Sequence, residues 1–297
     1  MRRVAVLLLP LMLAGCFLRG PPAEPVAPHY VLGPPYEING YWFYPQASYS
    51  AEQSGLAIVY GGGHPRLTAD GERLDQTALA AAHQTLQLPA IARVTNLENG
   101  RQVVVRVNDR GPAGPGRLIA ATRRTAELLG FPPSGVARIR LEVLPAESRA
   151  AVEAAGGDPN ERLALATAPR GRVEASDLPP AGTPPVIRPL RESFAASAKD
   201  TGWVPVAPPL RMPEQVTLVP VRPTSLWIEM GTFSQREFAE RQRARVAALR
   251  PRIESLRTGR EQTYRVRIGP LSDVGEADAV LVQVIRAGVP DARIVVE

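Results

Sequence analysis

The chain has 297 residues, 44% of them hydrophobic, 31 prolines and a formal net charge of +6. A single cysteine excludes an intrachain disulfide framework and a cysteine cluster for zinc, and three scattered histidines do not suggest a metal site. The basic residues are interleaved with acidic ones, so nucleic acid is not an expected partner. We therefore expect neither a metal nor a cofactor.

The N-terminus has the pattern of an export signal. Two arginines precede the apolar residues 4–13, a run far shorter than the roughly 20 residues needed to span a bilayer. The letters L-A-G-C that follow, ending at Cys16, are similar to a bacterial lipobox. We expect a signal peptide over 1–15 and lipidation of Cys16, because several acyl chains on one residue give stable anchoring. A plain secretory signal with an incidental cysteine is the alternative.

Residues 16–50 and 51–145 differ in pattern. The first segment is rich in Pro and Tyr and is expected to be a tether that ends in an aromatic collar. The second alternates short apolar runs with turn residues, which is typical of a small β-barrel. Within it, two β-rich runs flank the pair Asn99-Gly100, which predicts a hairpin. A helix is expected over 122–129, followed by a strand over 137–144; these lie in the same segment.

Residues 146–222 are dominated by Pro, Ala, Gly, Arg and Glu and are predicted to be a linker. As a coil it would span on the order of 50 Å, so the domain after it is expected to reach sites well away from the barrel. Residues 223–297 have the order βαβαβ, with one further candidate strand near 256–263, which indicates a small α+β sandwich. A capping box at Ser234 and a cap at Asp273 are expected to begin its two helices.

Both ordered regions resemble parts of one known family. Residues 55–144 resemble the catalytic region of the rare lipoprotein A (RlpA) family, a double-psi β-barrel, and residues 224–297 resemble a SPOR domain. The segments that carry the resemblance are T-A-D-G-E at 68–72, D-Q-T-A-L-A-A-A-H at 75–83, V-R-V-N-D-R-G-P at 105–112, E-M-G-T-F at 229–233 and R-V-R-I-G-P at 265–270. The order of lipobox, barrel, linker and SPOR domain is also that of the family.

The resemblance implies a mostly β plus α+β chain, in which a Pro-rich linker joins a small double-psi β-barrel to a small SPOR domain. It implies an endolytic lytic transglycosylase that cuts the β-1,4 bond between N-acetylmuramic acid and N-acetylglucosamine and leaves a 1,6-anhydro end. The expected partner is peptidoglycan, preferably strands stripped of stem peptides at the division septum, with division-site proteins as further candidates. Phe17 after the cysteine favours the outer membrane, facing the periplasm.

Such a reaction needs only one carboxyl group, because the C6 hydroxyl of the substrate attacks the anomeric carbon. That carboxyl first protonates the leaving oxygen and then accepts the C6 proton. Asp109 is the candidate, since it follows a valine-rich strand and precedes a rigid turn; pairing with Arg110 or capping a turn are the structural alternatives. The resemblance adds Glu72, Asp75 and His83 as catalytic-site residues.

These three residues have alternatives of their own. Glu72 or Asp75 would raise the pKa of Asp109 or hold a sugar hydroxyl. Asp75 also sits where an N-cap belongs, ahead of a helix over 76–82. His83 would hydrogen-bond a carboxylate or the substrate, or be a satisfied core histidine. In the SPOR region, the resemblance implies that Glu229, Thr232 and Arg265 contact glycan.

Several positions depart from the family pattern. Ala120 stands where the family commonly has an aspartate, and A-I-V-Y-G at 57–61 replaces the usual A-S-W-Y-G. Glu229 replaces a glutamine, so an ionised side chain that only accepts hydrogen bonds replaces one that also donates them. If Ala120 replaces the proton donor, the chain is a non-catalytic peptidoglycan-binding septal lipoprotein, which is the main alternative function. Wall loosening without bond cleavage is a third.

Overall fold

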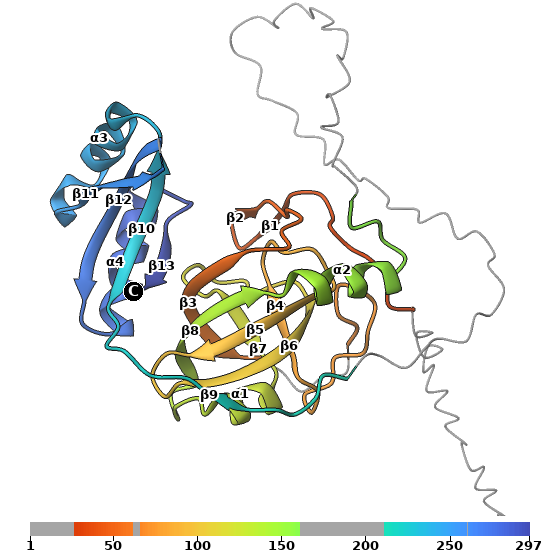
Figure 1. Ribbon diagram of the computed structural model, residues 1–297. Helices are drawn as coiled ribbons and strands as arrows, with labels where there is room; N and C mark the ends of the chain where they lie inside the picture. The colour runs from red at the N-terminus through yellow and green to blue at the C-terminus, as the bar shows by residue number, and fades with distance from the viewer. Residues whose placement is uncertain (1–26, 62–65, 161–210, 260) are drawn as a thin grey trace, which may run out of the picture.

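The structure is a computed structural model that describes residues 27–61, 66–160, 211–259 and 261–297 (Figure 1). The predicted signal peptide, Cys16 and most of the predicted linker lie outside these ranges. Across the ranges described, no helix is both long enough and apolar enough to cross a membrane.

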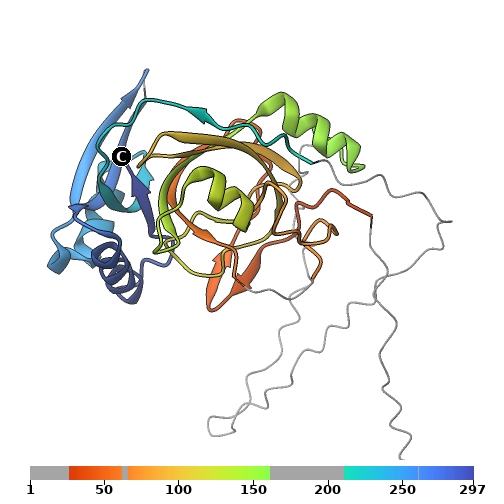
Figure 2. The ribbon, with the colours of Figure 1, turned by 90° about the horizontal axis from the view of Figure 1, so that it is seen from below.

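A closed six-stranded β-barrel forms the first domain. Its strands are ordered β4-β7-β3-β8-β5-β6, and pairing of β4 with β6 closes the ring. The pairs β3–β7 and β4–β6 are parallel and the others antiparallel. The bounds are β3 Glu52–Val59, β4 Ala80–His83, β5 Ala90–Asn96, β6 Arg101–Asp109, β7 Ile119–Ala121 and β8 Val136–Val143. Viewed along the ring, helix α1 (Arg123–Leu129) lies across one opening (Figure 2).

The barrel elements arise largely where the sequence predicts them. The Asn99-Gly100 turn joins β5 to β6 as an antiparallel hairpin, and the side chain of Asn99 donates to the carbonyl of Leu129 at 2.9 Å. Thr122 is the N-cap of α1, and Gly130 ends the helix in the left-handed conformation. Strand β8 begins one residue before its expected start. The predicted fold class, a β-barrel followed by an α+β domain, is confirmed.

The helix expected over 76–82 is wrong. Asp75 accepts hydrogen bonds from the amide and hydroxyl of Thr77 at 2.8 and 2.6 Å, which makes a tight turn instead of a helix cap. The alanines that follow form β4, between β6 and β7. Their small side chains are fully or nearly fully buried, so pairing within the barrel overrides the helix propensity of alanine.

The described parts of the predicted tether and linker are packed against the barrel. In the tether segment, β1 (Tyr36–Ile38) and β2 (Tyr41–Phe43) pair as a short hairpin. In the linker segment, α2 (Pro145–Ala154) buries Ser148, whose hydroxyl and the backbone of Ile91 hydrogen-bond each other. Strand β9 (Thr217–Leu218) adds to the edge of β6. Composition alone did not distinguish these ordered stretches from coil.

The C-terminal α+β domain is a four-stranded antiparallel sheet ordered β11-β12-β10-β13, with α3 and α4 sharing its apolar core. Its elements are β10 Leu226–Phe233, α3 Arg236–Arg245, a 3-10 turn Ala247–Leu249, β11 Arg252–Thr258, β12 Glu261–Leu271, α4 Val274–Arg286 and β13 Arg293–Val296. Asp273 caps α4 as predicted. The capping box at Ser234 is wrong, because Gln235 is the N-cap of α3 and makes no side-chain cap hydrogen bond.

The two domains are docked against each other through β3 and β13 (Figure 1). Leu56 of the barrel belongs to the apolar core of the C-terminal domain. Gly116 permits the close approach, since a Cβ atom there would lie 2.7 Å from Leu281 and 2.9 Å from Ile294. Arg117 donates two hydrogen bonds to Asp278, at 2.6 and 2.8 Å. The C-terminal domain therefore lies beside the barrel in this structure, while the linker composition predicted that it could reach sites well away from the barrel.

Candidate active site

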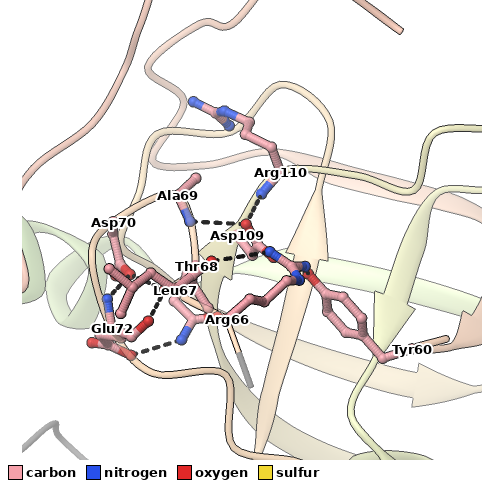
Figure 3. A network of polar contacts seen from close by, with 10 residues as sticks. Tyr60, Arg66, Leu67, Thr68, Ala69, Asp70, Glu72, Asp109 and Arg110 are labelled. Atoms are coloured by element: carbon pink, nitrogen blue, oxygen red, sulfur yellow. Dashed lines mark hydrogen bonds and ion pairs between the residues drawn. The ribbon is translucent and has the colours of Figure 1, made fainter. Parts of the chain in front are cut away.

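Asp109 is the last residue of β6, and its carboxylate is enclosed by hydrogen-bond donors (Figure 3). Its Oδ1 accepts from the backbone amides of Ala69 and Arg110, both at 2.8 Å. Its Oδ2 accepts from the phenol of Tyr60 and from the guanidinium of Arg66. Four donors around one carboxylate are the environment of its ionised form, which only accepts hydrogen bonds.

Tyr60 and Arg66 come from the segments on either side of residues 62–65 and converge on Asp109 (Figure 3). Burial, followed by the hydrogen bond to Asp109, raises the pKa of the Tyr60 phenol, which therefore stays protonated and donates. The side chain of Arg66 is 45% exposed while that of Asp109 is 4% exposed. The buried carboxylate of Asp109 is thus bound by a guanidinium that is itself half exposed.

Glu72 belongs to a second, buried cluster that adjoins Asp109 through the backbone of β6. One oxygen of Glu72 accepts from Arg106 at 2.7 Å and the other accepts from Asn108 at 2.6 Å. Asp70 lies on the same guanidinium, with Oδ2 3.5 Å from Arg106. Because Asn108 directly precedes Asp109, the cluster fixes the strand end from which Asp109 projects.

Asp70 is the group of this cluster with a displaced titration. Burial and the neighbouring charge of Glu72 raise the pKa of Asp70 from 3.8 to about 6. Its Oδ1 accepts from the hydroxyl of Thr68 at 2.7 Å, while within the described residues its Oδ2 accepts no hydrogen bond. Ionised Asp70 is therefore destabilised in the folded protein.

This displacement predicts the pH dependence of one substitution. The raised pKa of Asp70 gives the fold a contribution that is complete below pH 3.8 and is lost as the pH rises through 6. We therefore expect the stability of the Asp70→Asn chain relative to its parent to rise between pH 4 and pH 8. The rise in the difference between their free energies of unfolding should be on the order of 2–3 kcal/mol. Urea unfolding at both pH values measures this difference. The exposed Asp158→Asn is the control, and an equal pH dependence in the two variants would contradict the assignment.

His83 is a buried, neutral residue in β4. Burial, followed by the positive charge of Arg110, lowers its pKa to about 3. Nδ1 accepts from the amides of Thr85 and Leu86 at 3.0 and 3.2 Å, so the proton is on Nε2, which faces the side-chain oxygen of Gln53 at 3.3 Å. His83 thus fixes the turn after β4, in agreement with the core-histidine alternative.

Asp75 and Ala120 take different positions around this site. Asp75 is engaged in its local turn, and the hydrogen bonds from Thr77 lower its pKa. Among the predicted catalytic-site residues, the structure therefore groups Glu72 with Asp109 and leaves Asp75 in a turn. Ala120 pairs with Ala82, which in turn pairs with Asp109. An aspartate at 120 would lie two strands from Asp109 in the same row of the barrel.

The predicted glycan contacts of the C-terminal domain lie on β10 and β12. Thr232 is exposed and is paired with Arg265 across the two strands. Glu229 is 8% exposed and is ion-paired with Arg293 and, at 3.8 Å, with Arg265. Arg265 also binds Glu297 at 2.6 Å. These charged groups hold one another in place, so they are fixed in position before any ligand arrives.

Sequence reasoning missed four members of the site, namely Tyr60, Arg66, Asp70 and Arg106. A signal existed for Arg106, because an arginine between valines in a buried strand requires an acidic partner. Asp70 stands inside the T-A-D-G-E segment, where a second acid two residues from Glu72 indicated mutual perturbation. Tyr60 and Arg66 carried no such signal, since their contact with Asp109 joins residues that are more than 40 positions apart in the sequence.

Both domains match models of known protein families. Residues 52–141 match the family model described as lytic transglycolase, and residues 223–294 match the model of the SPOR domain. A protein of Pseudomonas aeruginosa strain UCBPP-PA14, named endolytic peptidoglycan transglycosylase RlpA, is 30% identical over 286 residues, covering 88% of this chain and 75% of the relative. A Rickettsia bellii protein of the same name is 40% identical over 124 residues, covering 40% of this chain.

These matches define a chain with a lytic-transglycolase barrel and a SPOR domain. It belongs to the RlpA family. The aligned part spans 55% of the length of the Rickettsia bellii relative. A crystal structure of the RlpA SPOR domain from Pseudomonas aeruginosa corresponds to 24% of this chain and 96% of that chain, with 22% identity and a TM-score of 0.22.

Proposed function

We propose that this chain is an endolytic lytic transglycosylase that cleaves the glycan strands of peptidoglycan, with Asp109 as the residue that transfers the proton. The observation that carries the proposal is the setting of Asp109. Its carboxylate is oriented by two backbone amides, a phenol and a guanidinium, and the oxygen that binds Tyr60 and Arg66 is in contact with the half-exposed side chain of Arg66. A positioned carboxyl at the end of a barrel strand is what this chemistry needs.

The reaction proceeds through two proton transfers at Asp109. Protonated Asp109 gives its proton to the glycosidic oxygen as the bond to the anomeric carbon breaks. The resulting carboxylate accepts the proton of the C6 hydroxyl, whose oxygen closes the 1,6-anhydro ring on the same carbon. The hydrogen-bond set around Asp109 corresponds to the second, ionised form. In the acid form, Oδ2 would no longer accept the hydrogen bond from Arg66 and would instead donate its proton to the glycosidic oxygen.

Glu72 acts as a positioning residue in this proposal. Both of its oxygens are bound to Arg106 and Asn108, so neither faces substrate in this structure. The bond to Asn108 holds the strand end that presents Asp109. His83, with its ring neutral and both nitrogens engaged, positions the turn after β4 and takes no proton. Asp75 holds the turn at Thr77 and pairs with Arg211 at 3.4 Å, and it has no catalytic role in this proposal.

The same proposal covers the substrate and the location. The SPOR domain recruits the chain to septal peptidoglycan, and the barrel prefers strands that have lost their stem peptides. Lipidated Cys16 anchors the chain to the outer membrane from the periplasmic side. The charged residues Glu229, Arg265 and Arg293, held by their mutual ion pairs, support binding of a ligand rich in hydroxyl groups.

A non-catalytic peptidoglycan-binding lipoprotein is the alternative function, and Ala120 favours it. In that case Asp109 would hold a sugar hydroxyl through the same donors. The two functions differ in whether glycan is released. We keep the enzyme as the proposal, because Asp109 and its supporting cluster are complete without a carboxylate at 120.

The substrate preference makes the proposal testable. We expect the full-length chain to release soluble glycan from amidase-treated sacculi at least about tenfold faster than from untreated sacculi, because stem peptides would obstruct a barrel-edge site. Chromatography of the released glycans measures both rates. Binding to both substrates without release from either would support the non-catalytic alternative. Equal release from both substrates would support an enzyme but contradict its preference for strands without stem peptides.

A further inference from the structure

A groove of about 670 Å³ lies between the barrel and the C-terminal domain. Its walls come from three parts of the chain, the β1–β2 hairpin, the start of β3 with the turns after β4 and before β7, and the edge of the C-terminal sheet around β13. In Figure 1 the hairpin and β13 lie on either side of β3. The lining of the groove includes Trp42, Tyr44, Gln84, Arg117, Arg265 and Arg293.

The hairpin wall presents aromatic rings to solvent. Trp42 is 56% exposed and Tyr44 is 55% exposed. Beneath them Tyr36 and Phe43 stack with ring centroids 5.3 Å apart, and the hydroxyl of Tyr36 donates to the carbonyl of Gln84 at 2.6 Å. The hairpin is therefore fixed to the barrel, and none of the described residues covers its large outer rings. Exposed rings on a rigid support mark a binding surface.

The opposite wall presents charged groups that are already oriented. Arg265 is bound by Glu297 and Glu254, and the 62% exposed Arg293 is bound by Glu229. Guanidinium groups donate to hydroxyl oxygens and carboxylates accept from hydroxyl hydrogens. A pocket with aromatic faces on one side and a few fixed polar groups on the other suits a ring that is apolar on its faces and polar at its rim. Pyranose sugars have that character.

A hydrogen bond connects the groove to the turn that follows the candidate active site. Gln84 lies in its floor, and the side-chain amide of Gln84 donates to the carbonyl of Pro112 at 2.9 Å. Pro112 belongs to the turn that follows Asp109. The relative position of the two walls is fixed by the ion pair of Arg117 with Asp278 and by the packing of Leu281 and Ile294 over Gly116.

From this arrangement we infer that the groove is a glycan subsite shared by the two domains, in which a strand lies between the rings of Trp42 and Tyr44 and the β13 edge. The inference rests on the proposed function for the identity of the glycan, and it adds where the strand is held. It means that the docked pair of domains binds one strand together. The C-terminal domain would then hold the strand beside the barrel that cleaves it.

The test uses the full-length chain with Asp109→Asn, so that binding is measured without turnover. The probe is amidase-stripped glycan strands from sacculi, in an equilibrium binding assay. We expect Trp42→Ala with Tyr44→Ala to weaken binding about tenfold, since exposed aromatic anchors dominate such surfaces. Trp42→Tyr, which keeps an aromatic face, should restore most of the affinity. Phe238→Ala, an exposed aromatic of α3 at 42% exposure, is the matched control and should bind as the parent does.

Equal binding by the double variant and its parent would contradict the assignment of the groove as a glycan subsite. A loss of binding that also occurs in the Phe238→Ala control would overturn it as well, because the effect would not be specific. Thermal unfolding of each variant identifies any general loss of structure. If the double variant is destabilised, near-parental affinity of the Trp42→Tyr chain supports the groove, and a loss of about tenfold in that chain contradicts it. The proposed function fails differently, through an absence of 1,6-anhydro ends from the chain with Asp109 intact.

Discussion

Replacing Asp109 by asparagine is expected to lower the rate of glycan cleavage by about 10²–10⁴-fold, because the amide cannot donate and then accept the transferred proton. Asparagine keeps an oxygen for the amides of Ala69 and Arg110, so the local fold should persist. Release of glycan from amidase-treated sacculi, followed over time, measures the rate.

The matched control for that variant is Glu142→Gln, which changes an exposed carboxylate that pairs with Arg93 on the outside of the barrel. Its rate should equal that of the unchanged chain. Binding of glycan strands by the Asp109→Asn chain should be retained, because the contacts proposed for the SPOR domain are intact. A similar rate in the Asp109→Asn chain would remove Asp109 from the mechanism.

The second large effect is on stability. Arg106 is the cation of the buried cluster, with 8% of its side chain exposed and Glu72 and Asp70 on its guanidinium. Arg106→Leu would leave the buried carboxylate of Glu72 without its cationic partner. We expect the free energy of unfolding to fall by about 3–5 kcal/mol, the usual cost of removing one partner from a buried ion pair. Urea unfolding at pH 8 measures it.

Arg93→Leu is the control, since the pair of Arg93 with Glu142 is 35% and 47% exposed and should contribute less than about 1 kcal/mol. Adding Glu72→Gln to Arg106→Leu should recover part of the loss, because the unpaired charge is then absent. If Arg106→Leu costs no more than Arg93→Leu, the buried cluster does not support the barrel as described.

Local signals predicted the parts of the fold that depend on local chemistry. The Asn99-Gly100 turn, the helix expected over 122–129 and the Asp273 cap are each specified by a few neighbouring residues, and each is present, with the helix beginning at residue 123. The helix expected over 76–82 is absent because three of its alanines pair with strands β6 and β7, which are distant in sequence. Ordered segments inside the predicted tether and linker were missed for the same reason.

The candidate site was predictable to the extent that its residues share motifs. Asp109 and Glu72 were expected together and lie in adjoining clusters joined by Asn108. The guanidinium of Arg66 on Asp109, and the neutral, fully hydrogen-bonded ring of His83, depend on how loops return to the barrel. The groove between the domains requires their docking, which no local pattern in either domain encodes.

Labelled water can show whether a single carboxyl, that of Asp109, supports cleavage in which water does not attack the glycan. The full-length chain is incubated with amidase-treated sacculi in ¹⁸O-labelled water, and the muramic ends of the released glycans are analysed by mass spectrometry. Because the C6 hydroxyl attacks in place of water, we expect 1,6-anhydro ends that contain no ¹⁸O and are absent from the Asp109→Asn reaction. Reducing ends labelled with ¹⁸O, or no released glycan at all, would contradict this mechanism.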